Sequence, residues 1–211
     1  MRNPIDHLTR GLPSGWRVTI DWLVTILGAI AIVIAVKTWV VNPYKIPTSS
    51  MEPTLHCARP DFGCEASFSD RVLACRFCYR FWSPKRGDII VFHTPALAQT
   101  KCGAGGNVFV KRLIGLPGEK VYEDRKGFIW ITRPGAKVGF KLKEPYVQAS
   151  RRLQDNAHMN REWAVPKGYY FMMGDNRAES CDSRTWGGVP KANLIGTVVI
   201  RYWPLSRLGF P

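Results

Sequence analysis

Ser50 and Lys111 are the two residues of this 211-residue chain whose side chains could combine in one reaction. A serine hydroxyl attacks an amide only when a base removes its proton, and a lysine amine is that base only while uncharged. At pH 8 a lysine with a pKa near 10.4 is less than ~1% neutral, whereas a pKa lowered to about 8 makes it half neutral, at a cost of roughly 3 kcal/mol. The pair therefore needs a water-poor site.

The local pattern around Lys111 offers such a site. Lys111 lies in a run of β-branched and aromatic residues, and the period of two in a strand places it on the same face as Phe109 and Leu113. Taken singly, Lys111 would more often be a solvated strand lysine, and Ser50 a turn serine or helix cap. The two residues need a wider context before they indicate catalysis.

An apolar segment precedes Ser50. Residues 18–41 carry only two charges, Asp21 and Lys37, and as a helix they would extend about 36 Å, against a ~30 Å hydrocarbon core. We expect one transmembrane helix here. The remaining length has room for one mid-sized domain, which we place at residues 42–211.

Basic residues flank the apolar segment on its N-terminal side. Arg2, Arg10 and Arg17 precede it, so the positive-inside rule predicts a cytoplasmic segment at 1–17 and an extracytoplasmic domain after the helix. A cleaved secretory signal is the alternative. The small residues that a cleavage site would need, Ala29 and Ala31, fall inside the apolar run rather than after it, which favours a retained anchor.

The formal net charge is +14, without a single long basic run. A broadly positive surface favours anionic phospholipid as a partner. Nucleic acid is the competing partner, but the sequence has no helix-turn-helix, zinc-finger or aromatic RNA-binding signature, so we expect none.

Short β-type runs and frequent Gly and Pro residues predict a mainly β, antiparallel domain. Two stretches, 56–82 and 94–106, are expected to be insertions between strands. The predicted strands are 88–92, 108–114, 128–132, 169–173 and 197–203.

Four segments then carry a resemblance to a known family. They are 46–55, 86–92, 110–118 and 174–187, in that order behind the apolar helix. Together they resemble the bacterial type I signal peptidases of peptidase family S26, which are membrane-bound Ser-Lys proteases that remove signal peptides from exported proteins. The resemblance implies the antiparallel β fold of that family and no cofactor.

The resemblance also implies roles for individual residues. Ser50 would be the nucleophile and Lys111 the general base, with the Ser180 hydroxyl orienting the lysine amine. The oxyanion would be held by the Ser50 backbone N–H and the Thr48 hydroxyl. The chain departs from many relatives at 178–179, where Ala and Glu replace Asp and Asn.

Two further sets follow from the resemblance. Asp182 and Arg184 would form a structural ion pair behind the site, whereas a surface pair of little energetic value is the alternative. Apolar walls would admit small side chains one and three residues before the cut, the Ala-x-Ala rule. The matching wall residues are Tyr44, Ile46, Pro47, Met51, Leu55, Val91, Phe109 and Val110.

The six cysteines lie outside the four segments or just beside the predicted site. An even number in an extracytoplasmic domain favours disulfides, with Cys102 and Cys181 as one conceivable pair, although six cysteines allow 15 pairings. A zinc site is the alternative, with Cys57, Cys64, Cys75 and Cys78 as ligands. Catalysis needs neither.

Aromatic and basic residues are interspersed in the first insertion. Such a mixture beside a membrane-proximal site would contact lipid head groups, and a small core for the insertion itself is the alternative. The residues are Arg71, Arg76, Phe77, Tyr79, Arg80, Phe81 and Trp82.

The sequence therefore predicts a single-pass serine endopeptidase on the outer face of the bacterial plasma membrane. Its expected partners are secreted preproteins cleaved after Ala-x-Ala sites, anionic phospholipid and the protein-export translocon. A peptidase dedicated to one pilin or conjugation protein would share every catalytic residue and remains an alternative, as does an inactive membrane-tethered binding domain. A self-cleaving repressor would need a DNA-binding N-terminus where 18–41 lies.

Overall fold

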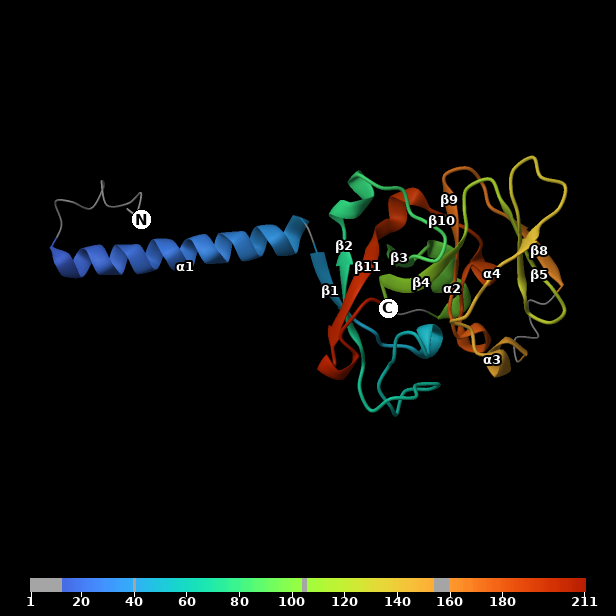
Figure 1. Ribbon diagram of the computed structural model, residues 1–211, viewed down its shortest axis with the longest axis horizontal. Coiled ribbons are helices and arrows are strands. Elements are labelled where there is room, and N and C mark those ends of the chain that lie inside the picture. Colours follow the sequence, from blue (N-terminus) through green and yellow to red (C-terminus); the bar gives the residue numbers. More distant parts are fainter. Residues whose placement is uncertain (1–12, 40, 104–105, 154–159) are drawn as a thin grey trace. The chain divides into compact units, whose positions relative to one another are not determined.

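A computed structural model describes residues 13–39, 41–103, 106–153 and 160–211 (Figure 1). The chain divides into two compact units, 1–41 and Asn42–Pro211. Residues 1–12, which include most of the expected cytoplasmic segment, lie outside the described part, as do the side chains of 36–40.

The first unit contains one long helix, α1 (Ser14–Trp39), of 26 residues. At 1.5 Å per residue it is about 39 Å long. Its stretch Ser14–Ala35 has a mean hydropathy of 2.3 and no buried residues, so its length and composition suffice to cross a bilayer. The helix begins four residues before the expected position because the Pro13 carbonyl already accepts the first helical hydrogen bond, from the Trp16 N–H at 3.0 Å.

The second unit is built on a seven-stranded sheet in the order β1-β2-β11-β3-β4-β9-β10 (Figure 1). Its registered neighbours run antiparallel from β2 through to β10. The strands are β1 (Val41–Lys45), β2 (Arg71–Cys75), β3 (Ile89–His93), β4 (Val108–Gly115), β9 (Tyr169–Met173), β10 (Val189–Pro190) and β11 (Leu194–Trp203).

A four-stranded antiparallel sheet lies next in the fold, in the order β7-β6-β5-β8. Short helices and 3₁₀ turns connect the strands of both sheets. The strands of the smaller sheet are β5 (Lys120–Glu123), β6 (Ile129–Thr132), β7 (Phe140–Lys141) and β8 (Arg161–Ala164). The short helices are α2 (Ala96–Cys102), α3 (Ala149–Leu153) and α4 (Ser183–Trp186). The 3₁₀ turns are η2 (Ser49–Met51), η3 (Phe77–Arg80), η4 (Arg177–Glu179), η5 (Lys191–Asn193) and η6 (Leu205–Arg207).

The large sheet is covered on both faces at its centre. Successive residues of β3 alternate between two core clusters: Val91 packs with Ile46 and Met51, whereas Ile90 and Phe92 pack on the other side. A strand buried on both faces needs apolar residues at every position, which explains the unbroken run at 89–92. The predicted mainly β, antiparallel class is correct, and the five predicted strands correspond to β3, β4, β6, β9 and β11.

The expected insertion at 56–82 requires a correction. Its part Arg71–Cys75 forms β2, a strand of the large sheet between β1 and β11. Val72 and Ala74 are fully buried on one face, while the other face is less covered. The strand is short and follows a polar, cysteine-containing loop, so its alternation is hard to recognise from the sequence. The described residues of the stretch 94–106 lie between β3 and β4 and contain α2.

All six cysteines are paired in disulfides. The pairs are Cys57–Cys64, Cys75–Cys78 and Cys102–Cys181. These bonds use the sulfur atoms that the alternative zinc site would need, so that alternative is wrong for this structure. The Cys102–Cys181 bond joins the end of α2 to the residue after Ser180, across 79 positions of sequence.

We predict that removing the Cys102–Cys181 bond destabilises the domain more than removing Cys75–Cys78. A disulfide stabilises the folded domain by restricting the unfolded chain, and the effect grows with the length of the loop that it closes. The expected contribution is about 4.5 kcal/mol for Cys102–Cys181, with a separation of 79 residues, and about 2 kcal/mol for Cys75–Cys78, with a separation of 3. Denaturant unfolding of Cys102→Ser/Cys181→Ser and of the matched Cys75→Ser/Cys78→Ser variant measures the difference. Equal losses would show that the long cross-link adds nothing beyond the folded contacts.

Candidate active site

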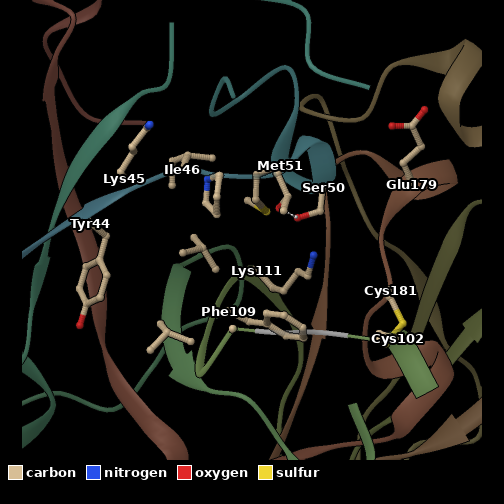
Figure 2. A pocket seen from close by; sticks show the side chains of 16 residues that line it. Tyr44, Lys45, Ile46, Ser50, Met51, Cys102, Phe109, Lys111, Glu179 and Cys181 are labelled. Atoms are coloured by element: carbon tan, nitrogen blue, oxygen red, sulfur yellow. Dashed lines mark hydrogen bonds between the residues drawn. A yellow bond between two sulfur atoms is a disulfide. The ribbon is translucent and has the colours of Figure 1, made fainter. Parts of the chain in front are cut away.

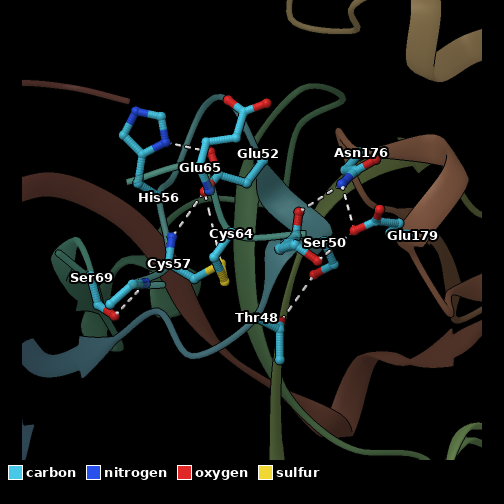
Figure 3. Close-up of a disulfide and its surroundings, with 12 residues drawn as sticks. Thr48, Ser50, Glu52, His56, Cys57, Cys64, Glu65, Ser69, Asn176 and Glu179 are labelled. Atoms are coloured by element: carbon cyan, nitrogen blue, oxygen red, sulfur yellow. Dashed lines mark hydrogen bonds and ion pairs between the residues drawn. A yellow bond between two sulfur atoms is a disulfide. The ribbon is translucent and has the colours of Figure 1, made fainter. Parts of the chain in front are cut away.

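The first catalytic candidate, Ser50, lies in the short turn η2 between the extended segment after β1 and the core. The turn is closed by a hydrogen bond from the Glu52 N–H to the Ser49 carbonyl, 3.0 Å. Met51, directly after Ser50, is buried in the core, which anchors the turn. Thr48 has extended backbone angles, and its Oγ1 lies 3.4 Å from Ser50 Oγ (Figure 3).

Residues 174–176, after β9, hold this turn in place. The Asn176 N–H donates to the Ser50 carbonyl at 3.1 Å, and Asn176 Nδ2 donates to the Ser49 carbonyl at 3.2 Å. Thr54 Oγ1 donates to Asp175 Oδ2 at 2.6 Å. The carbonyls of Ser49 and Ser50 therefore both accept hydrogen bonds, and the orientation of the Ser50 side chain is restricted by its backbone.

Lys111 lies in the middle of β4, opposite Ile90 of β3, and only 4% of its surface is exposed. Its side chain lies between Phe109 and Ser50, and its amine points toward Ser50 (Figure 2). The Phe109 ring centre is 5.6 Å from the Lys111 Nζ. This is the apolar environment that the strand period predicted.

Burial dominates the electrostatics of Lys111. It lowers the pKa of the Lys111 amine to about 8, against the smaller raising effects of Asp182 and Asp175 and with a further lowering by Arg184. Low-dielectric surroundings disfavour the charged form of an amine. A large fraction of Lys111 is therefore neutral under mildly alkaline conditions.

Ser180 lies close to the backbone of Ser50. It is buried, and Gly174 separates it from Ser50: a Cβ built on Gly174 would be 2.3 Å from Ser180 Oγ and 2.4 Å from the Ser50 carbonyl oxygen. Gly174 therefore has no room for a side chain between Ser50 and Ser180. The sequence analysis did not predict Gly174 as a site residue. Only the folded structure shows that this position must be a glycine because no side chain fits there.

Asp182 and Arg184 form the expected ion pair. Asp182 Oδ1 accepts from Arg184 Nε and Asp182 Oδ2 from Arg184 Nη2, both at 2.9 Å, and both side chains are buried. Asp182 Oδ2 also accepts from the Gly174 N–H at 3.0 Å. Burial raises the pKa of Asp182 and lowers the pKa of Arg184 to about 10. A surface pair, the alternative, is excluded by this burial.

The structure also contains a second buried ion pair, between Arg112 and Asp175, which the sequence analysis did not predict. Arg112 Nε and Nη2 donate to Asp175 at 2.8 and 2.6 Å, and Arg112 Nη1 donates to the Gly87 carbonyl at 2.7 Å. The guanidinium lies 4.0 Å from the centre of the Tyr146 ring. Arg112, on the opposite face of β4 from Lys111, fixes Asp175 and through it the Ser50 turn.

A cavity of about 620 Å³ opens beside the Ser50–Lys111 pair. Six of the eight expected wall residues line it: Tyr44, Ile46, Pro47, Met51, Phe109 and Val110. The other two, Leu55 and Val91, are fully buried behind the cavity, in the core cluster that contains Ile46 and Met51. They support the wall rather than form it.

Comparisons with known proteins place the chain in a family. The model of the signal peptidase family, peptidase S26, matches residues 19–203. The chain belongs to this family. It is 34% identical to a probable signal peptidase I-1 of Synechocystis sp. (strain PCC 6803), over 94% of this chain and 89% of the relative. It is 35% identical to a signal peptidase I of Leptolyngbya laminosa, over 86% and 78%. A signal peptidase I structure from Enterococcus faecalis V583 is 34% identical, with a TM-score of 0.43, and covers 55% of this chain and 97% of that one.

Ala178 and Glu179 come directly before Ser180, and the structure shows what Glu179 does. Its Oε2 accepts hydrogen bonds from Ser49 Oγ at 2.9 Å and from Asn176 Nδ2 at 3.4 Å (Figure 3). The loop therefore still holds the nucleophile turn, by contacts of its own.

A group of possible metal ligands also lies near η2. Atoms of Glu52, His56 and Glu65 lie within 4.8 Å of one another. Glu52 is fully buried, its Oε1 accepts from the Cys57 and Glu65 N–H groups at 3.1 and 3.3 Å, and its Oε2 pairs with His56 Nδ1. Because the Glu52 oxygens already have protein partners, we interpret the group as the hydrogen-bonded anchor of the loop after η2.

We predict that kcat/KM for amide cleavage rises with pH up to about 8 and then levels off. The active form contains neutral Lys111, whose fraction grows from about 1% at pH 6 to about half at pH 8. The measurement is a pH series with a peptide that has no group titrating in this range. A flat profile between pH 6 and 9 would contradict a lysine base.

We also predict that Gly174→Ala removes activity from protein that remains folded, because its methyl group would push Ser50 and Ser180 apart. Gly115→Ala is the matched control. A Cβ there would be 2.7 Å from the Val121 side chain and 2.8 Å from Phe171 Cβ, a comparable clash outside the cavity.

The readout is kcat per folded molecule, with folding measured by circular dichroism. Gly115→Ala should lose stability but keep its activity per folded molecule. Retention of full activity by folded Gly174→Ala would contradict the contact inferred here.

Proposed function

We propose that the chain is a membrane-anchored serine endopeptidase that removes N-terminal signal peptides from exported preproteins, using Ser50 and Lys111. The observation that carries this proposal is the buried Lys111 amine, with its pKa lowered to about 8 and its direction toward Ser50. An inactive binding domain would have no use for a strand lysine held in this costly state.

The acylation step follows from the positions of the side chains. Lys111 Nζ takes the proton of Ser50 Oγ as the oxygen attacks the carbonyl carbon of the residue before the cut. The oxyanion that forms accepts hydrogen bonds from the Ser50 N–H and the Thr48 hydroxyl. When the C–N bond breaks, Lys111 returns the proton to the leaving amine, and the mature protein departs with a new N-terminus.

Deacylation repeats the cycle with water. Lys111, neutral again, takes a proton from a water molecule that attacks the ester carbonyl, and the same donors hold the oxyanion. The ester bond breaks, and Ser50 Oγ regains the proton from Lys111. The signal peptide is released as a carboxylic acid, which loses its proton to solvent. In this scheme Ser180 is the residue that positions the lysine amine, a role supported by its burial and by its place across Gly174 from the Ser50 carbonyl.

The cavity supports a preference for small side chains before the cut. Its walls near the nucleophile are bulky, with Ile46, Met51 and Phe109 among them. Bulky walls leave shallow pockets that admit a methyl group and exclude larger side chains. The extended segment 44–47 can pair with the substrate backbone by strand addition. These features fit an Ala-x-Ala site.

Membrane anchoring by α1 brings the enzyme to substrates that are themselves membrane-tethered. In the proposed orientation the N-terminus is cytoplasmic, and the Asn42–Pro211 unit acts on the outer face of the bacterial plasma membrane, beside the protein-export translocon. Exposed aromatic rings at Phe77, Phe81 and Trp82, next to Arg76 and Arg80, support contact with anionic head groups.

We predict that Ser50→Ala and Lys111→Met each lower the cleavage of an Ala-x-Ala preprotein by a factor of roughly 10⁴ or more, because each removes an essential reacting group. Lys120→Met, on an exposed strand position, is the matched control and should keep its activity. Gel-shift or mass-spectrometric detection of the mature product measures cleavage. Full activity of either catalytic variant would reject the assignment.

The stability of Lys111→Met separates a catalytic loss from a folding loss. The lowered pKa means that the unfolded state binds more protons between pH 8 and 10.5, so the wild type gains stability as pH rises through this window. Below pH 8 the buried amine costs about 3 kcal/mol, which methionine does not. Lys111→Met should therefore be as stable as the wild type at pH 7, or more so.

A further inference from the structure

The cavity beside Ser50 has a charge distribution that the proposed reaction does not use. Lys45, Lys111 and Glu179 are the residues with formally charged side chains among those that line it. Lys111 is neutral in the reactive form, so one cation and one anion remain. Lys45 and Glu179 lie on opposite sides of the Ser50–Lys111 pair (Figure 2).

In the proposed function, the two sides of the cavity bind different parts of the substrate, before and after the cut. The inference rests on that proposed function. The pockets for residues before the cut are formed around Tyr44 and Ile46, on the side of Lys45. A substrate seated there continues past Ser50 toward Glu179 and the Cys102–Cys181 disulfide, which also line the cavity. This end of the cavity therefore receives the first residues of the mature protein.

Glu179 is held at this end as a fixed carboxylate. Its Oε2 accepts from Ser49 Oγ and Asn176 Nδ2, both neutral groups, and the side chain is exposed to the cavity. A Cβ built on Gly63 would overlap Glu179 Oε2, so the neighbouring loop packs directly against it. The ion pairs of the described residues include no cation that balances Glu179.

Glu179 has no part in the acid–base chemistry. The carboxylates that act on Lys111 are Asp182 and Asp175. The chain as a whole carries a net charge of +14, so the Glu179 carboxylate at the leaving-group end has the opposite sign to the molecule's net charge. A charge so placed distinguishes ligands by sign.

We propose that Glu179 forms an acidic subsite for the first residues after the cleaved bond, selecting preproteins with a basic side chain there over those with an acidic one. A lysine or arginine in this position would lie near the carboxylate, whereas an aspartate or glutamate would be repelled. Because the site is partly open to solvent, the preference is moderate, roughly 3- to 10-fold between Lys and Glu.

The experiment uses peptides with one Ala-x-Ala sequence that differ only in having Lys, Gln or Glu as the second residue after the cut. The ratio of kcat/KM for the Lys and Glu peptides is measured for the wild type and Glu179→Gln. Glutamine keeps an oxygen to accept from Ser49 Oγ but removes the charge. The ratio should fall to about 1 in Glu179→Gln and should invert in Glu179→Lys.

Lys45→Gln is the matched control, since it neutralises the opposite end of the cavity and should leave the Lys/Glu ratio at its wild-type value. The wild-type ratio should also shrink as salt screens the carboxylate. An unchanged ratio in Glu179→Gln, or an equal change in Lys45→Gln, would overturn the proposal.

Binding of the same peptides to Lys111→Met, followed by fluorescence anisotropy, tests the subsite without turnover. Tighter binding of the Lys peptide supports it, and equal affinities contradict it. Complete absence of cleavage by the wild type would contradict the proposed function instead, so the two failures are distinguishable.

Discussion

The arrangement of the site depends on the burial of the Lys111 amine, which can accept a proton only while it is uncharged. Removal of Lys111 from water outweighs two carboxylates, Asp182 and Asp175, that favour its protonation. Each of these acids is neutralised locally, Asp182 by Arg184 and Asp175 by Arg112, with paired hydrogen bonds. Without these arginines the two acids would attract a proton to Lys111, so the ion pairs behind the site protect the base as well as the fold.

One segment after β9 links the nucleophile to the base. Gly174 lies against the Ser50 carbonyl, and its N–H donates to Asp182. Asp175 accepts from Arg112 on β4, and the Asn176 N–H donates to the Ser50 carbonyl in the turn. Lys111 is on β4 itself, directly beside Arg112. A shift of this segment would therefore move the nucleophile relative to the base. Precise geometry of this kind arises from residues whose own rotamers are fixed by buried hydrogen bonds.

Much of this could be predicted from the sequence, and the failures have physical causes. Long β-branched runs such as 108–114 are strands because both faces are buried, and Lys111 stands out within one. Strand β2 was missed because five residues after a polar loop show too few alternations. The role of Arg112 is hard to recognise from the sequence, because a charged residue on a strand is usually solvated and its partner Asp175 is 63 positions away. Val91 faces the core rather than the cavity because β3 is covered on both faces. Such long-range partners are set by the folded chain.

The two ends of the cavity are built differently, and this accounts for the position of two of the three disulfides. The end near Tyr44 and Ile46 adjoins β1, β3 and β4, where strand pairing fixes the backbone. The end near Glu179 is formed by loops and short helices, which have few such hydrogen bonds. Two cross-links are found here: Cys102–Cys181 joins α2 to the residue after Ser180, and Cys57–Cys64 closes the loop whose Gly63 packs on Glu179. Covalent bonds thus replace sheet pairing where the chain has to hold a charge in a fixed place beside a reacting bond.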